Sequence, residues 1–431
     1  MGRRCPGRFP SLYWRGRTLI RGRPAPAVSA LLPDAGKRFR IDGGVADMHP
    51  VRTALAPLLL WLVLLAPAPH GPVVPAFAGD SDPETKHDPA PTALPDRIIL
   101  TWSGDPATTQ SVTWRTSDIV EEAWAEIAPA EPSPDFTRDA RMSLAASEPL
   151  LAESGRAICH SVVFTGLSPN TLYAYRVGSE EGWSEWFQFR TADAGPAPFS
   201  FLYFGDAQSR TLEMWSRVIR GAFAAAPAAR FLLHAGDLVD DGENDTMWGE
   251  WFRAGGWIHA TVPSVPAIGN HEYAGDDTPP AHWRAQFTLP ENGIPGLEET
   301  NYFIDYQSLR VLVLDSNARL EDQARWLEAT LRANPKKWTI ATFHHPIWSA
   351  TTGRDNEELR ELWKPLFERY EVDLVLQGHD HTYARGRNVA GVGDLPVGKD
   401  GPVYVVSVSG RKMYELPERS WWDRAAEDTQ L

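Results

Sequence analysis

The sequence contains very little cysteine. Only Cys5 and Cys159 occur among its 431 residues, and Cys5 lies far upstream, so a disulfide framework cannot stabilise the folded part of the chain. A long hydrophobic run is also missing, because the apolar stretch at residues 54–66 is short and flanked by proline. That length does not predict a membrane span.

Basic residues are scarce once the first 78 residues are set aside. That segment holds 11 of the 42 Lys and Arg residues but only 3 of the 56 Asp and Glu residues, which leaves 31 against 53 and a formal charge of −22. Such a surface argues against nucleic-acid binding, which needs basic patches. A small anionic substrate stays compatible with it, because bound cations dominate the local field of a site.

The N-terminal region shows the features of upstream and targeting segments. Residues 1–47, rich in Arg, Gly and Pro, are expected to be disordered or wrongly assigned to the protein. Residues 48–78 combine a charged start, the apolar stretch and Ala-Phe-Ala, which is typical of a secretory signal peptide. We expect a secreted, periplasmic or cell-surface protein without a stable membrane span after signal removal; an uncleaved anchor is the alternative. Residues 79–94 form a polar, Pro-rich linker.

Residues 95–191 have an all-β pattern. Turn signals separate short apolar and aromatic runs, which lie at residues 98–102, 111–115, 123–127, 159–164, 172–177 and 186–190. The segment from Leu167 to Tyr173 predicts a tyrosine corner, in which the Tyr hydroxyl ties back a strand connection. The sequence therefore predicts a β-sandwich that resembles a fibronectin type III domain.

Beyond a linker at residues 192–198, strands alternate with amphipathic helices. Apolar residues recur at helical spacing in residues 212–226, 321–333 and 357–370. We therefore expect residues 199–431 to form an α/β domain in which helices cover a mixed sheet. The predicted fold class is multidomain: an all-β sandwich followed by an α/β domain.

Five strand-like runs of this second domain end in Asp, Asn or His. Open α/β sheets hold their ligands at the carboxyl ends of strands, so these side chains are expected at one rim. Carboxylate, amide and imidazole groups together are the donors of a metal pair with a shared carboxylate. The candidate ligands are Asp206, Asp237, Asn270, His344, His379 and His381.

Asp237 is the best candidate for the shared carboxylate, because it ends the central run. Asp206 and His381 would complete the shell of one ion. The second ion would take Asn270, His344 and His379, although the doublet leaves His345 open as the ligand in place of His344. We expect two metal ions, with Fe, Zn and Mn all open as their identity.

The order of these motifs identifies a family. GD-x-Q, GD-x-x-D, GNHE, H-x-P and GHDH, at residues 205–208, 236–240, 269–272, 344–346 and 378–381, resemble the motifs of the calcineurin-like metallophosphoesterases. With the sandwich in front, residues 95–431 look like a bacterial purple acid phosphatase homologue. The resemblance implies a mixed β-sandwich flanked by helices, a dinuclear metal centre at the six candidate ligands, and hydrolysis of phosphate monoesters, with diesters or pyrophosphates as substrates of some relatives.

Two positions depart from the family pattern. Purple acid phosphatases have a ferric-binding Tyr three residues after the shared Asp, where this chain has Asp240. The wider superfamily has a His two residues after the first Asp, where this chain has Gln208. Asp240 can bind as a carboxylate, Gln208 can bind through its amide oxygen, or water can fill the position. We expect a colourless enzyme.

Further candidates surround the predicted ligands. His271 is placed to give the leaving group a proton, and Glu272 to orient His271. His345 and Arg354 are candidate substrate-binding residues, the latter as a bidentate phosphate donor. In the expected reaction, a hydroxide activated by the metals attacks phosphorus in line with the leaving alkoxide.

Three functions remain open at this stage. The first is a secreted phosphatase that acts on small phosphate monoesters. The second is a phosphodiesterase acting on nucleotides or phospholipid headgroups with the same metals. The third is a non-catalytic surface binding protein in which the β domain does the work. The oligomeric state is not predicted.

Overall fold

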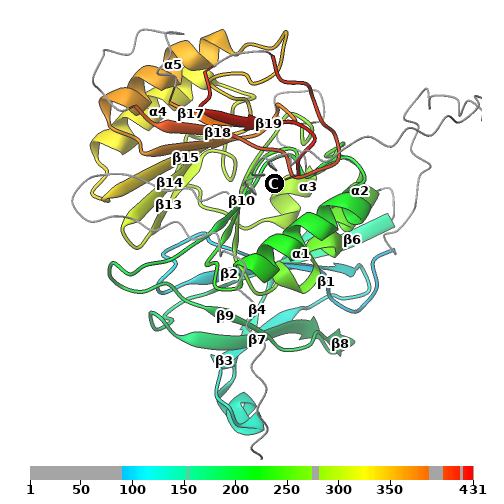
Figure 1. The fold of residues 1–431 in the computed structure, drawn as a ribbon. Helices are drawn as coiled ribbons and strands as arrows, with labels where there is room; N and C mark the ends of the chain where they lie inside the picture. Colours follow the sequence, from blue (N-terminus) through cyan, green and yellow to red (C-terminus); the bar gives the residue numbers. More distant parts are fainter. Residues whose placement is uncertain (1–89, 153–154, 274–280, 388–400, 418–420, 431) are drawn as a thin grey trace, which may run out of the picture.

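The computed structural model describes residues 90–152, 155–273, 281–387, 401–417 and 421–430 (Figure 1). The predicted upstream segment 1–47 and signal peptide 48–78 lie outside the described residues, as does the linker 79–94 except for residues 90–94. Within the described ranges, no helix combines the length and apolar character needed to cross a membrane.

The N-terminal part is a β-sandwich of two antiparallel sheets. One sheet has the strand order β1-β2-β6-β5, and the other has β4-β3-β7-β8 with β9 also paired to β7. The strands are β1 (Asp96–Thr101), β2 (Gln110–Ser117), β3 (Trp124–Pro129), β4 (Arg141–Leu144), β5 (Ala146–Ala152), β6 (Gly155–Phe164), β7 (Leu172–Ser179), β8 (Gly182–Trp183) and β9 (Phe187–Arg190), with a 3-10 turn η1 (Pro134–Asp139).

The tyrosine corner predicted at Tyr173 is confirmed. The backbone N–H of Ser168 donates to the Tyr173 hydroxyl at 2.9 Å, which ties the loop before β7 to that strand. Trp114 is buried in the sandwich core. Trp186 is only half-buried, since its ring lies under the Arg176 guanidinium and meets Phe136 edge to face near the surface.

The second part contains two further sheets. A parallel three-stranded sheet has the order β10-β11-β12, and a mixed seven-stranded sheet has the order β13-β14-β15-β16-β18-β17-β19. The strands are β10 (Leu202–Phe204), β11 (Leu232–Ala235), β12 (Ser264–Ala267), β13 (Tyr302–Tyr306), β14 (Leu309–Val313), β15 (Trp338–Thr342), β16 (Leu374–Gln377), β17 (Tyr383–Gly386), β18 (Val403–Val406) and β19 (Arg424–Ala426).

Helices flank these two sheets. Figure 1 shows α4 and α5 together over the seven-stranded sheet and α1 and α2 near β10. The three predicted helices are confirmed, although a π turn replaces the start of the first. The helical elements are η2 (Thr211–Trp215), α1 (Ser216–Ala225), α2 (Asp245–Gly255), η3 (Gly256–Ile258), α3 (Ala281–Gln286), α4 (Leu320–Arg332) and α5 (Glu357–Arg369).

The hydrophobic cores explain this arrangement. One buried cluster joins β10–β12 to α1, α2 and the near face of β13–β16, and another joins the far face of the larger sheet to α4 and α5. The central strands β14, β15 and β16 are therefore covered on both sides and are buried along their whole length, which is why their sequences are mostly apolar. The observed fold is the predicted one, a β-sandwich followed by a mixed two-sheet domain flanked by helices.

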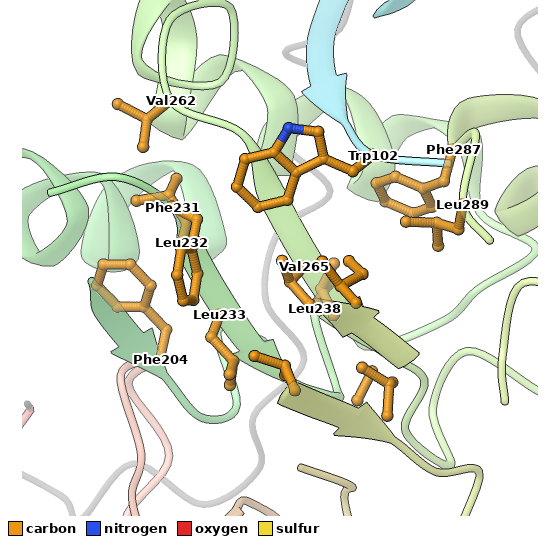
Figure 2. Packing of buried hydrophobic residues seen from close by; sticks show 14 of the residues in the cluster. Trp102, Phe204, Phe231, Leu232, Leu233, Leu238, Val262, Val265, Phe287 and Leu289 are labelled. Carbon is orange, nitrogen blue, oxygen red and sulfur yellow. The ribbon is translucent and has the colours of Figure 1, made fainter. Parts of the chain in front are cut away.

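The two parts share a core. Trp102, from the end of β1, packs 5.9 Å from the ring of Phe231 and 5.5 Å from that of Tyr306. Figure 2 shows Trp102 among the side chains of the cluster around β11 and β12. The Tyr175 hydroxyl also donates to the carbonyl of Ala260 at 2.7 Å. Contacts therefore continue across the predicted linker.

A buried ion-pair network crosses the same interface. Arg97 donates to one carboxylate oxygen of Asp245 at 2.7 Å, and Arg115 donates to the other at 3.0 Å. Arg115 also pairs with Asp96 through two hydrogen bonds. Asp245 is fully buried and begins α2, directly after the loop that follows β11. The sandwich therefore holds the start of α2 through two arginines.

Candidate metal centre

The polar strand ends meet at one place. Asp206 follows β10, Asp237 follows β11, and Asn270 follows β12. The larger sheet brings three histidines to the same place. They are His344 after β15, and His379 and His381 after β16.

These side chains form two groups that share Asp237. One group contains Asp206, Asp237 and His381, and the other contains Asp237, His344 and His379. In each group the candidate ligand atoms lie within 4.8 Å of one another. A carboxylate common to two groups is what a dinuclear site requires.

The distances define each group further. His381 Nε2 lies 3.5 Å from Asp206 Oδ1, and His344 Nε2 lies 3.0 Å from Asp237 Oδ2. Asn270 Oδ1 is 3.1 Å from both His344 Nε2 and His379 Nδ1. Asn270 therefore joins the second group, as the sequence predicted.

Glycine before a ligand allows the backbone segments to approach closely. A Cβ atom at Gly236 would lie 2.7 Å from His344 Nδ1, and one at Gly378 would lie 2.5 Å from Asp206 Oδ2. Real Cβ contacts are not that short, so any side chain here would displace a candidate ligand.

Two candidate ligands have left-handed backbone conformations. The φ angle is 50° at Asp237 and 69° at His379. Such conformations cost non-glycine residues about 1–3 kcal/mol and persist where surrounding contacts impose them. Glu272 supplies such contacts at the first turn, since its carboxylate accepts the backbone N–H groups of Asp237, Leu238 and Val239 at 2.9, 2.7 and 3.2 Å.

Two histidines are oriented by backbone carbonyls. His344 Nδ1 donates to the carbonyl of Ala235 at 2.9 Å, and His381 Nδ1 donates to that of Lys412 at 3.1 Å. A proton on Nδ1 leaves Nε2 with a lone pair directed at the carboxylates. Metal-binding histidines are commonly fixed in this way.

The electrostatics call for a positive charge between the groups. Burial and the neighbouring Asp237 carboxylate raise the pKa of Asp206 well above its usual value. Burial lowers the pKa of His344, but the Asp237 and Asp206 carboxylates and the Ala235 carbonyl together raise it by more, to about 10. A buried carboxylate pair thus competes for a cation, and a metal ion satisfies it more fully than one proton does.

The residues present fit a metal pair. Asp206 Oδ1 and Gln208 Oε1 are buried and have no hydrogen-bond partner in the described ranges. Unpaired buried oxygens of this kind are costly unless a cation binds them. The donor set of carboxylate, amide and imidazole suits Fe, Zn and Mn. The six predicted ligands are therefore the residues that would hold the two ions.

The two departures from the family pattern lie in different surroundings. Gln208 Nε2 is 3.1 Å from both Asp237 Oδ2 and His381 Nε2, within the first group. Asp240 instead accepts the backbone N–H of Ser209 at 2.7 Å and its hydroxyl at 2.9 Å. Both carboxylate oxygens of Asp240 are thus engaged by a loop.

The two catalytic candidates, His271 and Glu272, lie in different surroundings. His271 borders the site, where its backbone N–H donates to Asp237 Oδ1 at 3.0 Å and its Nδ1 to the Asp240 carbonyl at 2.7 Å. Glu272 was predicted to orient the His271 ring. The structure instead places its carboxylate on backbone N–H groups, including that of Gly269 at 2.7 Å, because the residue is fully buried under the Asp237 turn.

The substrate-binding candidates lie at the rim. The His345 ring is centred 4.3 Å from that of His379, and its Nδ1 is 2.9 Å from the Ser316 hydroxyl. Arg354 donates to the His379 carbonyl at 2.8 Å and to the Tyr414 hydroxyl at 3.3 Å. Arg354 is thus held beside the site and keeps further N–H groups for a ligand.

A sixth strand of this domain also ends in polar residues, which were not among the predicted site residues. Asp315 and Ser316 follow β14, and Asp315 is fully buried and accepts the hydroxyl of Tyr273. Ser316 accepts the backbone N–H of His345 at 3.0 Å as well as contacting its ring. The signal was present, because an apolar run ends in Asp here too. Ser316 therefore holds His345, the residue next to the ligand candidate His344.

Comparison with protein families agrees with this geometry. Residues 95–191 match the model described as the purple acid phosphatase N-terminal domain, and residues 199–383 match that of the calcineurin-like phosphoesterases. The chain belongs to the calcineurin-like phosphoesterase family. Within this family its domain pair is that of the purple acid phosphatases.

Individual relatives of this chain are distant. Acid phosphatase type 7 of Homo sapiens is 26% identical over 69% of the chain and 72% of its own length. Purple acid phosphatase 21 of Arabidopsis thaliana is 27% identical over 58% of each. An uncharacterised protein of Mycobacterium tuberculosis is 28% identical, and the match spans half of its length and 53% of this chain.

A solved structure shares the fold of this chain. Purple acid phosphatase PPD1 from yellow lupin seeds superposes with a TM-score of 0.64, 19% identity, and coverage of 78% of this chain and 69% of that chain. The structure of PhoD gives a TM-score of 0.54 at 14% identity, with coverage of 74% and 77%. Both superpositions show a shared fold.

Proposed function

We propose that the protein is a secreted phosphatase that hydrolyses small phosphate monoesters with a pair of metal ions. The observation that carries the proposal is the presence of two ligand groups with Asp237 in common. Family membership supports phosphoester hydrolysis as the reaction class. The names of the human and Arabidopsis relatives support phosphatase activity.

The protein side chains position the reaction. When bound, a metal pair lowers the pKa of water and neutralises phosphoryl charge. Asp237 and His344 are held in place by the Glu272 carboxylate and the Ala235 carbonyl. Preorganised ligands of this kind avoid the cost of rearrangement during the reaction.

His271 is the proposed proton donor. Its Nδ1 is held by the Asp240 carbonyl, which leaves Nε2 as the nitrogen available to a substrate. The residue is half-buried at the edge of the ligand groups. A protonated ring in this position would give its proton to the leaving alkoxide. His345 and Arg354, which both lie beside His379, are proposed to contact the phosphoryl oxygens.

Tyr414 connects the first ligand group to a neighbouring cavity. Its ring lies 4.7 Å from the His381 ring and lines a cavity of about 540 Å³. Glu415, Glu427 and Asp428 line the same cavity, whereas Arg354 and Lys412 lie 4.9 and 5.4 Å from the Tyr414 ring. The side of the site next to Tyr414 therefore carries charges of both signs.

Metal analysis combined with hydrolysis assays tests the proposal. We expect about two ions per chain and chelator-sensitive turnover of aryl phosphate monoesters, both lost in Asp237→Ala because this carboxylate serves both groups. Asp322→Ala removes a half-buried carboxylate of α4 that pairs with arginines of the same helix end, and it serves as the control. Faster turnover of diesters would favour the phosphodiesterase alternative. A folded protein with neither metal nor turnover would refute both enzymes and leave the surface-binding alternative.

Export is proposed from residues 48–78. N-terminal sequencing of protein recovered outside the cytoplasm is expected to begin near Gly79, after the Ala-Phe-Ala site. A recovered protein that retains residues 48–78 would support the uncleaved anchor instead.

A further inference from the structure

We propose that Gln208 binds the first metal ion through its amide oxygen, together with Asp206, Asp237 and His381, and that this neutral ligand adapts the site to divalent ions. The inference rests on the proposed dinuclear centre. It names the residue that takes the place of the family's usual additional ligand, which is a His at position 208 or a Tyr at position 240.

The Gln208 amide already lies among the candidate ligands. The side chain is 1% exposed, and its Nε2 is 3.1 Å from Asp237 Oδ2 and 3.1 Å from His381 Nε2. Its Oε1 is buried without a hydrogen-bond partner in the described ranges. One end of the amide is therefore satisfied and the other is not.

A bound cation would reverse which end of the Gln208 amide faces the ligand group. Asp237 Oδ2 and the lone pair of His381 Nε2 both accept, so without a cation they attract the NH2 end of the amide. A metal ion bound by these two atoms instead attracts oxygen. Rotation of the amide by about 180° exchanges its two ends within the same shape. It would bring the unpaired Oε1 to the ligand side of the group.

The surrounding loop holds Gln208 in this position. The backbone N–H groups of Ala207 and Gln208 both donate to the Asp237 carbonyl, at 3.0 and 3.2 Å. The next residues, Ser209 and Arg210, have φ angles of 69° and 57° and turn the chain sharply. Both oxygens of Asp240 bind Ser209 and stabilise this turn.

The two departures from the family pattern are therefore coupled. Asp240, where the family has its ferric-binding Tyr, holds the loop that directs Gln208 into the site. Asp240 acts as a positioning residue, and Gln208 takes the vacant ligand role. An amide oxygen is neutral, so the first site has one negative charge fewer than it would with a phenolate. Less negative charge favours a divalent over a trivalent ion.

Metal binding tests the inference without measuring turnover. The full chain, Gln208→Leu and Gln208→Glu are loaded with Mn²⁺ or Zn²⁺ and titrated against a competing chelator. We expect two ions in the wild type. Gln208→Leu should keep one tight ion and bind the other at least about tenfold more weakly, in line with the effect of losing a supporting ligand. Gln208→Glu offers an oxygen at the same place and should restore the second ion.

His379→Ala is the matched control, because it is expected to weaken the other ion. Wild-type affinity for both ions in Gln208→Leu would overturn the inference and leave the proposed function standing. Failure of the wild type to bind metal would overturn both. If Gln208→Leu does not fold, loss of the second ion in the isosteric Gln208→Glu would count against the inference.

Absorption spectroscopy gives a second readout. Loaded with ferric iron, the wild type is expected to show no intense visible band, because no phenolate is assigned to the site. A strong band of phenolate-to-iron charge transfer would assign a tyrosine as ligand and overturn the proposal.

Discussion

Acidification should destabilise the protein through two buried histidines. His234 and His259 lie in the aromatic core between β11 and α2, where the His259 ring stacks 4.2 Å from that of Trp251. In the described ranges, neither ring nitrogen of either histidine makes a hydrogen bond of ordinary geometry. Burial lowers the pKa of His259 to about 3 and lowers that of His234 as well.

The sign of the effect follows from proton binding. A histidine with a usual pKa of about 6.5 binds a proton in the unfolded chain at pH 4.5, whereas folded His259 stays neutral. Stability is therefore full above pH 6.5 and falls as the pH drops toward 3. With one pKa unit equal to about 1.4 kcal/mol, His259 alone should remove about 2.5 kcal/mol of the unfolding free energy between pH 7 and 4.5.

Urea denaturation at pH 7, 6, 5 and 4.5 measures this loss. Excess chelator throughout the series removes any contribution from metal release. His259→Met replaces the ring with a flexible apolar side chain. The variant is expected to lose about 2.5 kcal/mol less than the wild type over the series, whatever its stability at pH 7. Parallel curves for the two proteins would refute the reasoning.

Three substitutions test other parts of the structure. His271→Gln should lower kcat by about 10²–10⁴-fold with unchanged metal content, since it removes a proton donor; unchanged kcat would exclude that role. Glu272→Gln should lower the free energy of unfolding by about 3 kcal/mol and weaken metal binding, because charge-assisted hydrogen bonds to the Asp237 turn are lost. Wild-type values for both would mean that the turn keeps its conformation without the Glu272 carboxylate. Asp245→Asn should lower the free energy of unfolding by about 3–5 kcal/mol, because Arg97 and Arg115 lose their common buried charge. A loss below about 1 kcal/mol would show that water replaces the Asp245 carboxylate as their partner.

The ligand groups could be predicted because their signal is local. An apolar run followed by Gly and a polar residue, as at Gly236 and Asp237, indicates a strand whose end approaches other chains closely. Parallel strands then bring such ends together. The sequence analysis assigned Asn270 and His344 to the same ion, and the structure places Asn270 Oδ1 3.1 Å from His344 Nε2.

Other features have no local signal. Strands β4 and β5 are edge strands with mostly exposed side chains, so neither alternation nor an apolar run marks them. Glu272 was expected to orient its neighbour His271, yet it binds backbone groups from another strand end. The partners of Asp245 lie far upstream on the sandwich, and sequence spacing cannot reveal such a pair.

The network around Asp245 also bears on whether the sandwich is a detachable module. A fragment starting at residue 199 would lose both arginines that neutralise Asp245 and would uncover the apolar surface on which Trp102 packs. Since those contacts stabilise both parts at once, the full chain is expected to melt in a single cooperative transition. The predicted linker at residues 192–198 separates two domains in the sequence, but the two domains are expected to unfold together.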